Sequence, residues 1–166
     1  MIHSDVWGPC EVSSISGHRW FVTFIDDFSS YTWLYLLKHK SDVFSVFKDL
    51  FALIENQFGA TIKILRSDNS TEYINMEFGQ FLALHGIEHQ TICVNTPEQN
   101  GVAERKNRHL LEVARSLMFT MNVPKFLWGE AIKTTTYLIN CMPLHTLEFK
   151  TPAECLLKSN DFVVPP

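Results

Sequence analysis

Three acidic residues in separate parts of the chain have surroundings typical of catalytic carboxylates. Asp68 lies in R-S-D-N-S-T-E-Y, Glu104 lies in T-P-E-Q-N-G-V-A-E-R-K-N-R with 35 residues (69–103) between the two, and Asp5 lies in H-S-D-V-W-G-P. Three carboxylates that share a pocket raise one another's pKa, so such a group is stabilised by a divalent cation. Two cations about 3.5–4 Å apart can activate water or a 3′-hydroxyl and stabilise the leaving oxygen of a displacement at phosphorus. The three acids therefore indicate metal-dependent chemistry on a phosphodiester.

Each acid taken alone also has a structural explanation. Glu104 could form an i,i+4 ion pair with Arg108, worth about 0.3–0.5 kcal/mol on an exposed helix face. Asp68 follows an expected strand, where open α/β sheets place ligand groups, but it could equally accept hydrogen bonds in an Asx-turn. Asp5 could be a turn residue, and positions 26–27 provide two competing aspartates. These alternatives stay open on the residues alone.

Oxygen ligands of this kind favour Mg²⁺ or Mn²⁺ over zinc, and we expect two such ions. His85, His89 and Cys93 are spaced four residues apart, but Gly86 interrupts any helix that could bring them together. The four cysteines form no C-x-x-C pair, which disfavours both a zinc site and a disulfide framework. We therefore expect no zinc in this segment.

The chain is acidic overall, with a formal net charge of -4 and a pI of about 5.9. Contact with nucleic acid must then come from a local basic patch. The densest basic segment contains Arg105, Lys106, Arg108 and Arg115, and arginine suits phosphate because it forms charge-assisted hydrogen bonds. A solvated helix face is the alternative explanation of this segment.

Length and composition fit one globular domain. The chain has 166 residues, 46% of them hydrophobic, which is enough for one core and too little for two. We place the domain at 1–158 and a tail or the start of a linker at 159–166. No stretch approaches the roughly 20 apolar residues that span a bilayer, and the first residues lack the features of a signal peptide. We expect a soluble intracellular protein without membrane association.

Local patterns predict an α/β order with a mixed sheet. Two aromatic and β-branched runs around a short turn predict a hairpin at 20–26 and 31–37. Ser41 is expected to cap a helix that Gly59 ends. The remaining expected elements are strands at 61–66 and 87–93, helices at 75–85, 101–121 and about 124–140, and a short last helix opened by a capping box at 151–154. Only Met1 to Ser4 precede Asp5, so its strand is expected to be clipped on one side.

The helix expected at 101–121 would present Glu104 at the edge of its apolar face. At about 100° per residue, Arg108 and Arg115 lie close to the same stripe. The apolar face consists of Ala103, Leu110, Ala114, Leu117 and Met121. Glu104 could thus reach a groove beside the sheet without entering the core.

These segments together resemble the integrase catalytic core of copia-type LTR retrotransposons, a branch of the retroviral integrase superfamily with an RNase H-like fold. The likeness covers nearly the whole chain. In order, its motifs are H-S-D-V-W-G-P, F-I-D-D-F-S, L-R-S-D-N-x-x-E-Y, T-P-E-Q-N-G-V-A-E-R-K-N-R, L-I-N-x-M-P and K-T-P-x-E-C-L. Several spaced motifs in one order are far more specific than any single motif.

The resemblance implies a catalytic and metal-binding role for Asp5, Asp68 and Glu104. The 35-residue interval between Asp68 and Glu104 is that of the family. It implies a five-stranded mixed sheet flanked by helices, with Asp5 on the central strand, Asp68 just after the fourth and Glu104 on a flanking helix. It also places Asn100 in a catalytic loop that contacts DNA in relatives, and Arg108 one turn after the glutamate.

The activity implied by the resemblance is DNA integration. In this activity water first trims a DNA 3′ end and the new 3′-hydroxyl then attacks target DNA, so the resemblance implies a nucleotidyl transferase and endonuclease. The implied partners are retroelement ends, target DNA and further copies of the chain in a homodimer or higher oligomer. A functional protein of this kind is expected in the nucleus.

Departures from the family pattern support a different function as the alternative. Ser70 and Thr71 stand where the family has two glycines, so a turn that needs positive φ would be strained there and could displace Asp68. Cys141 occupies a position that is usually basic, and the family's upstream zinc-binding domain and downstream DNA-binding region are missing. The alternative is a catalytically inactive retrotransposon remnant that binds nucleic acid or dimerises. An RNase H-type nuclease is a third hypothesis, which fold alone does not separate from the first.

Overall fold

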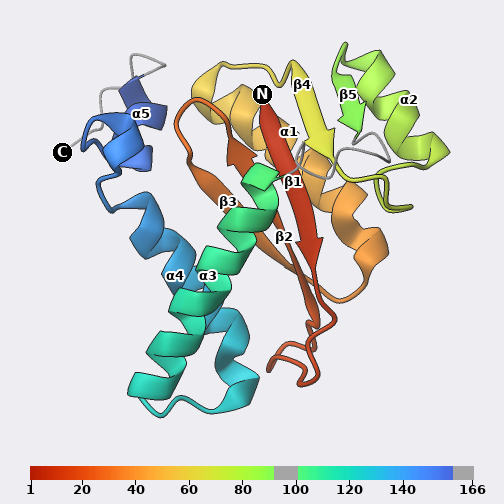
Figure 1. Cartoon of the computed structure of the whole chain (residues 1–166). Helices are drawn as coiled ribbons and strands as arrows, with labels where there is room; N and C mark the ends of the chain where they lie inside the picture. The colour runs from red at the N-terminus through yellow and green to blue at the C-terminus, as the bar shows by residue number, and fades with distance from the viewer. Residues whose placement is uncertain (92–100, 159–166) are drawn as a thin grey trace.

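A mixed five-stranded sheet lies at the centre of the computed structural model, which describes residues 1–91 and 101–158 (Figure 1). Its strands are β1 Ile2–Trp7, β2 Trp20–Asp26, β3 Thr32–Leu37, β4 Ile64–Ser67 and β5 Glu88–Thr91. They follow the order β3-β2-β1-β4-β5. The pairs β1–β2 and β2–β3 are antiparallel, whereas β1–β4 and β4–β5 are parallel. The expected sheet and hairpin are confirmed.

The central strand β1 has six residues, Ile2–Trp7, although it lies near the start of the sequence. All of its residues from Ile2 to Trp7 pair with β2 between Asp26 and Phe21. Its other edge pairs with β4. The short stretch before Asp5 is thus enough for six residues of β1 to pair with β2, whereas β4 pairs only with Ile2 and His3.

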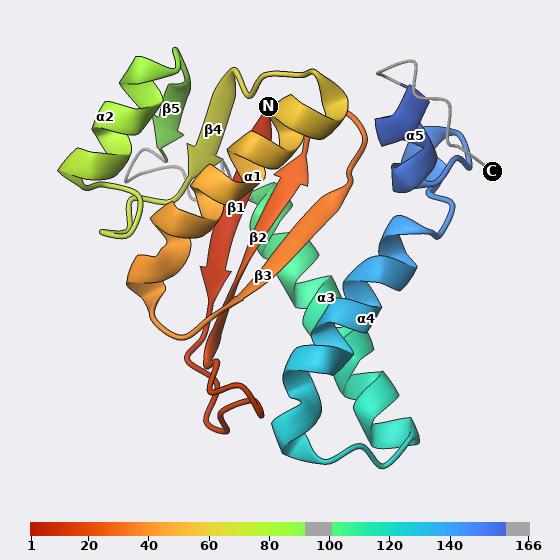
Figure 2. The same cartoon turned by 180° about the vertical axis from the view of Figure 1, so that it is seen from behind.

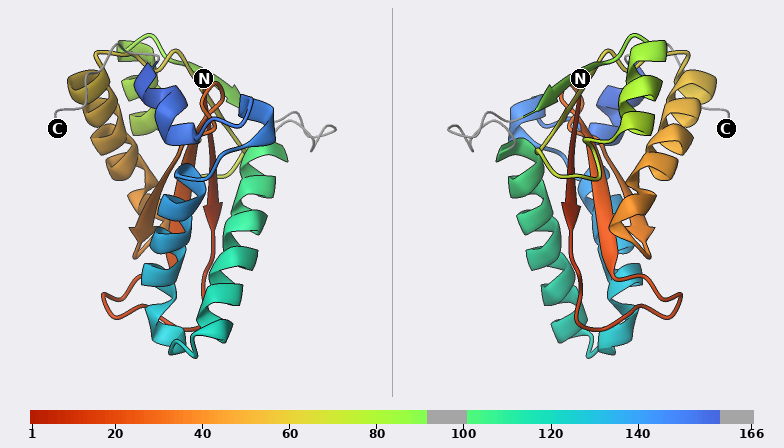
Figure 3. Two further views of the ribbon diagram at one scale, coloured as in Figure 1. Left: turned by 90° about the vertical axis from the view of Figure 1, so that its left-hand side faces the viewer. Right: turned by 90° about the vertical axis from the view of Figure 1, so that its right-hand side faces the viewer.

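Helices cover both faces of the sheet (Figures 2 and 3). They are α1 Val43–Phe58, α2 Met76–Leu84, α3 Gly101–Thr120, α4 Trp128–Asn140 and α5 Pro152–Lys158, with short 3-10 turns η1 Lys40–Asp42, η3 Lys125–Leu127 and η4 His145–Leu147. Helices α1 and α2 pack on one face, and α3 and α4 pack on the other. No helix among these residues is long and apolar enough to cross a membrane.

Alternating side chains of β2 supply both layers of the core. Phe24 points toward α1 and packs against Phe47 with the rings 5.9 Å apart. Phe21 points to the opposite face, where it joins Leu110 of α3 and Ile132 of α4. Period-two alternation in a strand buried on both faces produces this division. The same alternation places the buried polar Thr23 on the α3 side, next to the candidate site.

The start of α1 differs from the expectation, whereas its end agrees. A 3-10 turn precedes the helix, and Asp42 Oδ2 accepts a hydrogen bond from the backbone N–H of His39 at 2.9 Å. Asp42, and not Ser41, therefore satisfies the free backbone donor at this end. The helix stops at Gly59, which adopts a left-handed φ of 56°, as glycine at this position permits.

Of three further local expectations, two differ from the structure and one is confirmed. Strand β4 begins at Ile64 and not at residue 61. Met121 was expected on the apolar face of α3, but it lies just past the end of this helix and is 72% exposed. The capping box before α5 is confirmed, because Thr151 N donates to Glu154 Oε2 at 2.9 Å and Glu154 N donates to Thr151 Oγ1 at 3.1 Å.

Asn140, in the L-I-N-x-M-P motif, closes part of the free edge of β3. Its Oδ1 accepts from the backbone N–H of Thr32 at 3.0 Å, and its Nδ2 donates to the carbonyl of Thr32 at 2.8 Å. The asparagine thus replaces both bonds that a further strand would make to this residue of an edge strand. We ascribe the asparagine of this motif to the docking of α4 on the sheet.

Candidate active site

The parallel pairing of β1 and β4 brings Asp5 and Asp68 to the same level of the sheet. His3 of β1 lies opposite Arg66 of β4, and each aspartate follows two residues later in the sequence, Asp5 within β1 and Asp68 just beyond the end of β4. The side chains of alternate strand residues share a face, so Asp5 points with His3 toward the α3 side. Asp68 comes directly after the last residue of β4. The two acids are therefore neighbours although they lie far apart in the sequence.

Asp5 has the electrostatics of a carboxylate held beside other acids. Its pKa is raised from 3.8 to about 6, mainly by burial and further by the charges of Asp68 and Glu104, while a hydrogen bond from Asn107 partly offsets the rise. Each acid is close enough to act on the titration of Asp5. All three sequence-predicted acids thus share one electrostatic environment.

The side chain of Asp68 is held by Ser70, one of the two residues that stand where glycines were expected. Its Oδ1 accepts from the backbone N–H of Ser70 at 3.2 Å and from the Ser70 hydroxyl at 2.5 Å. Within 68–71, all of them described, neither Ser70 nor Thr71 has positive φ. The expected strain was therefore wrong, because the turn is built from side-chain hydrogen bonds instead of left-handed backbone. Asp68 therefore makes the Asx-type contact expected of a structural aspartate, and its charge also raises the pKa of Asp5.

Glu104 lies on the first turn of α3 and is exposed. Arg108, one turn later, is exposed as well, yet no ion pair joins these two described residues. The simple i,i+4 pair is therefore not formed. No group of three or more His, Cys, Asp and Glu side chains in the described part of the chain lies close enough together to hold a metal ion. The carboxylates have the donor chemistry for Mg²⁺ or Mn²⁺, but they do not assemble a metal-binding group in this structure.

The competing aspartates lie at the other end of β1. Asp26 pairs with Ile2 across the sheet and accepts hydrogen bonds from the amide and hydroxyl of Ser29 at 2.9 and 2.7 Å. Asp27 Oδ1 lies 2.7 Å from Nε2 of the buried His3. Both are engaged in the β2–β3 turn, so they do not compete with Asp5 for the site.

Asn107 is a site residue that the sequence reading missed. This residue is only 3% exposed on α3; its Nδ2 donates to Asp5 Oδ2 at 2.9 Å and its Oδ1 accepts from Thr23 Oγ1 at 2.7 Å. It therefore connects the acid to β2 and fixes its rotamer. The signal in the sequence was a polar residue between Ala103 and Leu110 on the apolar side of the helix.

Replacing Asn107 with leucine should raise the pKa of Asp5 further and lower the free energy of unfolding by about 1–3 kcal/mol, because Asp5 and Thr23 both lose a buried partner. The pKa is measured from the carboxyl carbon signal of Asp5 in an NMR pH titration, and stability from urea unfolding. Thr23→Val is the matched control, since it removes the other bond of Asn107 and leaves the bond to Asp5. An unchanged Asp5 titration in the leucine variant would contradict the assignment.

The basic residues expected to contact DNA divide into two groups. Arg105, Arg108 and Arg115 are exposed on α3. Lys106 points away from them, because its Nζ donates to the carbonyl of Ser30 in the β2–β3 turn at 3.4 Å and burial lowers its pKa. Lys106 therefore binds the β2–β3 turn, whereas the three arginines are exposed. Asn100 lies outside the described residues.

The histidines considered for zinc have other surroundings. His85 packs against Phe81 and Phe51, with ring centroids 4.1 and 4.6 Å apart. His89 on β5 lies 2.9 Å from the hydroxyl of Ser67, and burial lowers its pKa. Cys93 lies outside the described residues.

The chain is similar to known proteins in both sequence and fold. Residues 1–97 match the family described as integrase core domain. The chain is 47% identical over 152 residues to a retrovirus-related Pol polyprotein from transposon TNT 1-94 of Nicotiana tabacum, covering 92% of the chain and 11% of the polyprotein. It is 41% identical over 155 residues to the polyprotein from transposon RE2 of Arabidopsis thaliana, covering 93% and 10%. The chain thus spans about a tenth of the length of these relatives.

Solved structures with a similar fold include two retroviral integrases. One belongs to the simian T-cell lymphotropic virus intasome in complex with PP2A regulatory subunit B56 gamma, with a TM-score of 0.75 at 19% identity, covering 99% of this chain and 56% of that chain. The other is the HTLV-2 integrase catalytic core domain in complex with magnesium, in a trimeric form, with a TM-score of 0.65 at 17% identity and 93% coverage of both chains. At these identities the likeness concerns the fold alone, which is RNase H-like.

Proposed function

Because the chain belongs to the integrase core domain family, we propose that it is the core of a metal-dependent polynucleotidyl transferase that joins retroelement DNA to target DNA. The two reactions are the trimming of a DNA 3′ end by water and the attack of the new 3′-hydroxyl on target DNA. Both are displacements at phosphorus, so one set of carboxylates can serve both.

The observation that carries this proposal is the shared electrostatic environment of the three acids. The pKa of Asp5 rises to about 6 through burial and through the charges of Asp68 and Glu104. A fold gains no stability from gathering like charges in this way, whereas a cation-binding site requires it. The raised pKa therefore supports a site that is completed by divalent cations.

Asp5, Asp68 and Glu104 would together hold two Mg²⁺ or Mn²⁺ ions. When bound, the ions supply the positive charge that a displacement at phosphorus requires. The magnesium in the HTLV-2 core supports this choice of ion. Asn107 keeps Asp5 in one rotamer and Ser70 does the same for Asp68, whereas Glu104 is exposed and can change rotamer to join them.

The exposed arginines of α3 would bind the DNA backbone beside the acids. Arg105, Arg108 and Arg115 lie on the helix that carries Glu104, and such contacts position DNA without reading its sequence. We also propose that Asn100 contacts the DNA end and that the chain acts in the nucleus as a dimer or higher oligomer. The intasome and trimeric assemblies of the structural relatives support the last point.

The purified chain should reverse strand transfer on a branched DNA substrate when Mn²⁺ is present. The products are a resealed target duplex and a released retroelement end, which a denaturing gel resolves. Omission of the metal should stop the reaction. A folded chain that binds Mn²⁺ and DNA at high concentration without forming product would instead be a catalytically inactive module for nucleic-acid binding or dimerisation.

The salt dependence of DNA affinity should show that Arg108 contacts a phosphate and that its near neighbour Lys106 does not. Arg108→Gln should flatten the slope of log affinity against log salt by about 1, because one phosphate contact is lost. Lys106→Gln, the matched control, should leave the slope unchanged since Lys106 is directed at Ser30. Fluorescence anisotropy between low and high salt measures both. Equal slopes in the wild type and the Arg108 variant would contradict the proposed contact.

A further inference from the structure

The segment 68–75, which connects β4 to α2, contains Asp68 but forms neither strand nor helix. Its shape therefore depends on individual side-chain contacts. One contact is that of Asp68 with Ser70. A second joins the fully buried Tyr73 to β1, because its hydroxyl lies 2.6 Å from that of Ser4, the neighbour of Asp5. Breaking either of these would disturb the catalytic acids or the core directly.

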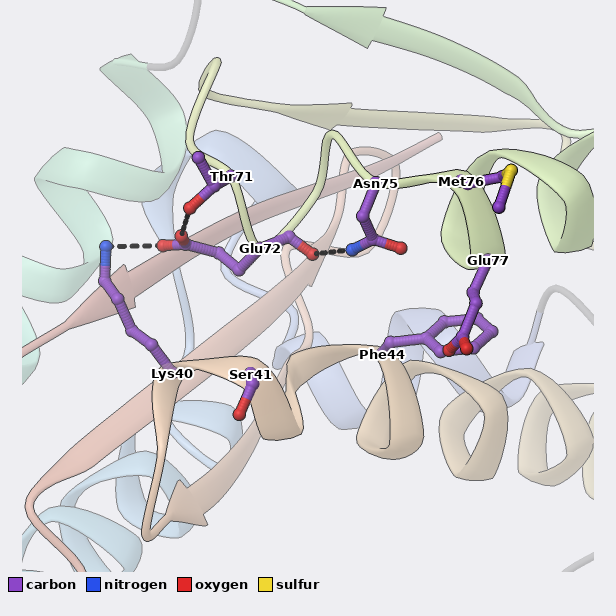
Figure 4. A pocket seen from close by; sticks show the side chains of 8 residues that line it. All are labelled: Lys40, Ser41, Phe44, Thr71, Glu72, Asn75, Met76 and Glu77. Atoms are coloured by element: carbon purple, nitrogen blue, oxygen red, sulfur yellow. Dashed lines mark hydrogen bonds and ion pairs between the residues drawn. The ribbon is translucent and has the colours of Figure 1, made fainter.

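A third contact fixes the segment from outside the catalytic group. Glu72 is 8% exposed, and its Oε1 lies 2.5 Å from Nζ of Lys40 in η1. Its other oxygen, Oε2, accepts from the hydroxyl of Thr71 at 3.5 Å, and Figure 4 shows both contacts side by side. A carboxylate this deeply buried is costly unless it is paired, so Glu72 holds its segment close to Lys40.

Glu72 is also connected to Asp68 through Ser70. Glu72 lies within the turn in which the backbone N–H groups of Tyr73 and Ile74 both donate to the carbonyl of Ser70, at 3.0 and 3.2 Å. The Ser70 hydroxyl donates to Asp68. A displacement of Glu72 would therefore be transmitted to Asp68 through this turn and the Ser70 side chain.

Lys40 is placed by two further features. Its ammonium lies over the ring of Trp20 at the start of β2, 5.6 Å from the centroid. It also lines a pocket of about 440 Å³ together with Glu72 and Glu77, shown in Figure 4. The Lys40 side chain is 40% exposed, so the pair can be altered by substitution from the solvent side of the pocket.

We propose that the Lys40–Glu72 ion pair is a positioning contact for Asp68, which connects η1 to the catalytic carboxylate through Glu72 and Ser70. This inference rests on the proposed function, since it assigns the pair a role in the same reaction. Neither residue touches the reacting atoms. Their role is to keep Asp68 level with Asp5.

Kinetics on the branched DNA substrate test the pair. Glu72→Gln and Lys40→Met should each lower kcat by about 10- to 100-fold with KM unchanged, because small displacements of a catalytic group have effects of this size. The double variant Lys40→Glu with Glu72→Lys restores the pair with reversed charges and should regain most of the rate. Glu77→Gln, the same substitution at an exposed residue of the same pocket, should behave as the wild type.

Amide hydrogen exchange of the chain without metal or DNA provides a second measurement. The amides of Ser70, Tyr73 and Ile74 donate to Asp68 or to the carbonyl of Ser70, so they report on this segment. They should exchange several-fold faster in Glu72→Gln and Lys40→Met, while the amides of α4 and the exchange in Glu77→Gln stay unchanged.

The two measurements keep the inference and the proposed function distinct. If the wild type is active and the variants match it in both kcat and exchange, the inference fails and the proposed function stands. If the wild type is inactive, the proposed function fails and exchange alone decides the inference. A loss of rate that the reversed pair does not restore, with unchanged exchange in 68–75, would also overturn it.

Discussion

Replacing Asp68 with asparagine is expected to lower the rate of Mn²⁺-dependent reversal of strand transfer by at least about 100-fold. A bound metal contributes several kcal/mol to a displacement at phosphorus, and each 1.36 kcal/mol corresponds to a factor of about 10 in rate. Asparagine keeps the acceptor oxygen for Ser70, which donates to Asp68 from both its amide and its hydroxyl. The loss should therefore reflect the missing charge and not a changed turn.

Asp27→Asn serves as the matched control for this experiment. Asp27 also follows a strand of the sheet, but it contacts His3 near the start of β1 and not Asp5. This variant should retain the wild-type rate. Circular dichroism and thermal unfolding confirm that both variants fold. An Asp68→Asn variant with more than about a tenth of the wild-type rate would argue against two-metal chemistry at this carboxylate.

The second large effect concerns Asp5, whose replacement by asparagine should stabilise the metal-free protein at pH 7.5 while abolishing its activity. The pKa of Asp5 is raised from 3.8 to about 6 in the folded state. The folded protein therefore retains a proton that the unfolded chain releases between these values, and stability falls as the pH rises through this window. At pH 7.5 the ionised Asp5 costs the fold about 1–3 kcal/mol, after a discount for its partial exposure.

Urea unfolding at two pH values measures this effect and contains its own control. At pH 3.5 Asp5 is largely protonated in both states, so Asp5→Asn and the wild type should differ little. At pH 7.5 the variant should be the more stable of the two. Addition of Mn²⁺ should then raise the stability of the wild type, because a ligand that binds only the folded state stabilises it, and should have little effect on the variant. A variant that is less stable than the wild type at pH 7.5 would contradict the electrostatic description of the site.

The sequence predicted most elements and the places of the three acids on them. The hairpin, the helix that ends at Gly59 and the capping box at 151–154 rest on contacts between residues close in the chain. The expected places of Asp5 on the central strand, Asp68 after β4 and Glu104 on α3 came from a resemblance in spaced motifs, and the sheet order confirms them. Such features are readable because they depend on short-range patterns or on motif order.

Expectations about the turn after Asp68 and about Lys106 needed the fold. Glycine preference suggested strain at Ser70, yet the side chain of this residue builds the turn by bonding to Asp68. Helix position alone grouped Lys106 with the arginines, whereas the β2–β3 turn, distant in sequence, captures its ammonium. In both cases a side-chain partner outweighed a backbone or compositional preference.

What the sequence by itself determined is the set of carboxylates and the α/β frame that carries them. Only the tertiary structure decided how these acids interact: Asn107 bonds Asp5 from a helix about a hundred residues away, and the pairing of β1 with β4 sets Asp5 level with Asp68. The reason is physical. Residue types and spacing specify which groups are available and which elements hold them, but burial, mutual charge and hydrogen-bond partners arise only when distant segments pack together. Those three quantities raise the pKa of Asp5 and make the site what it is.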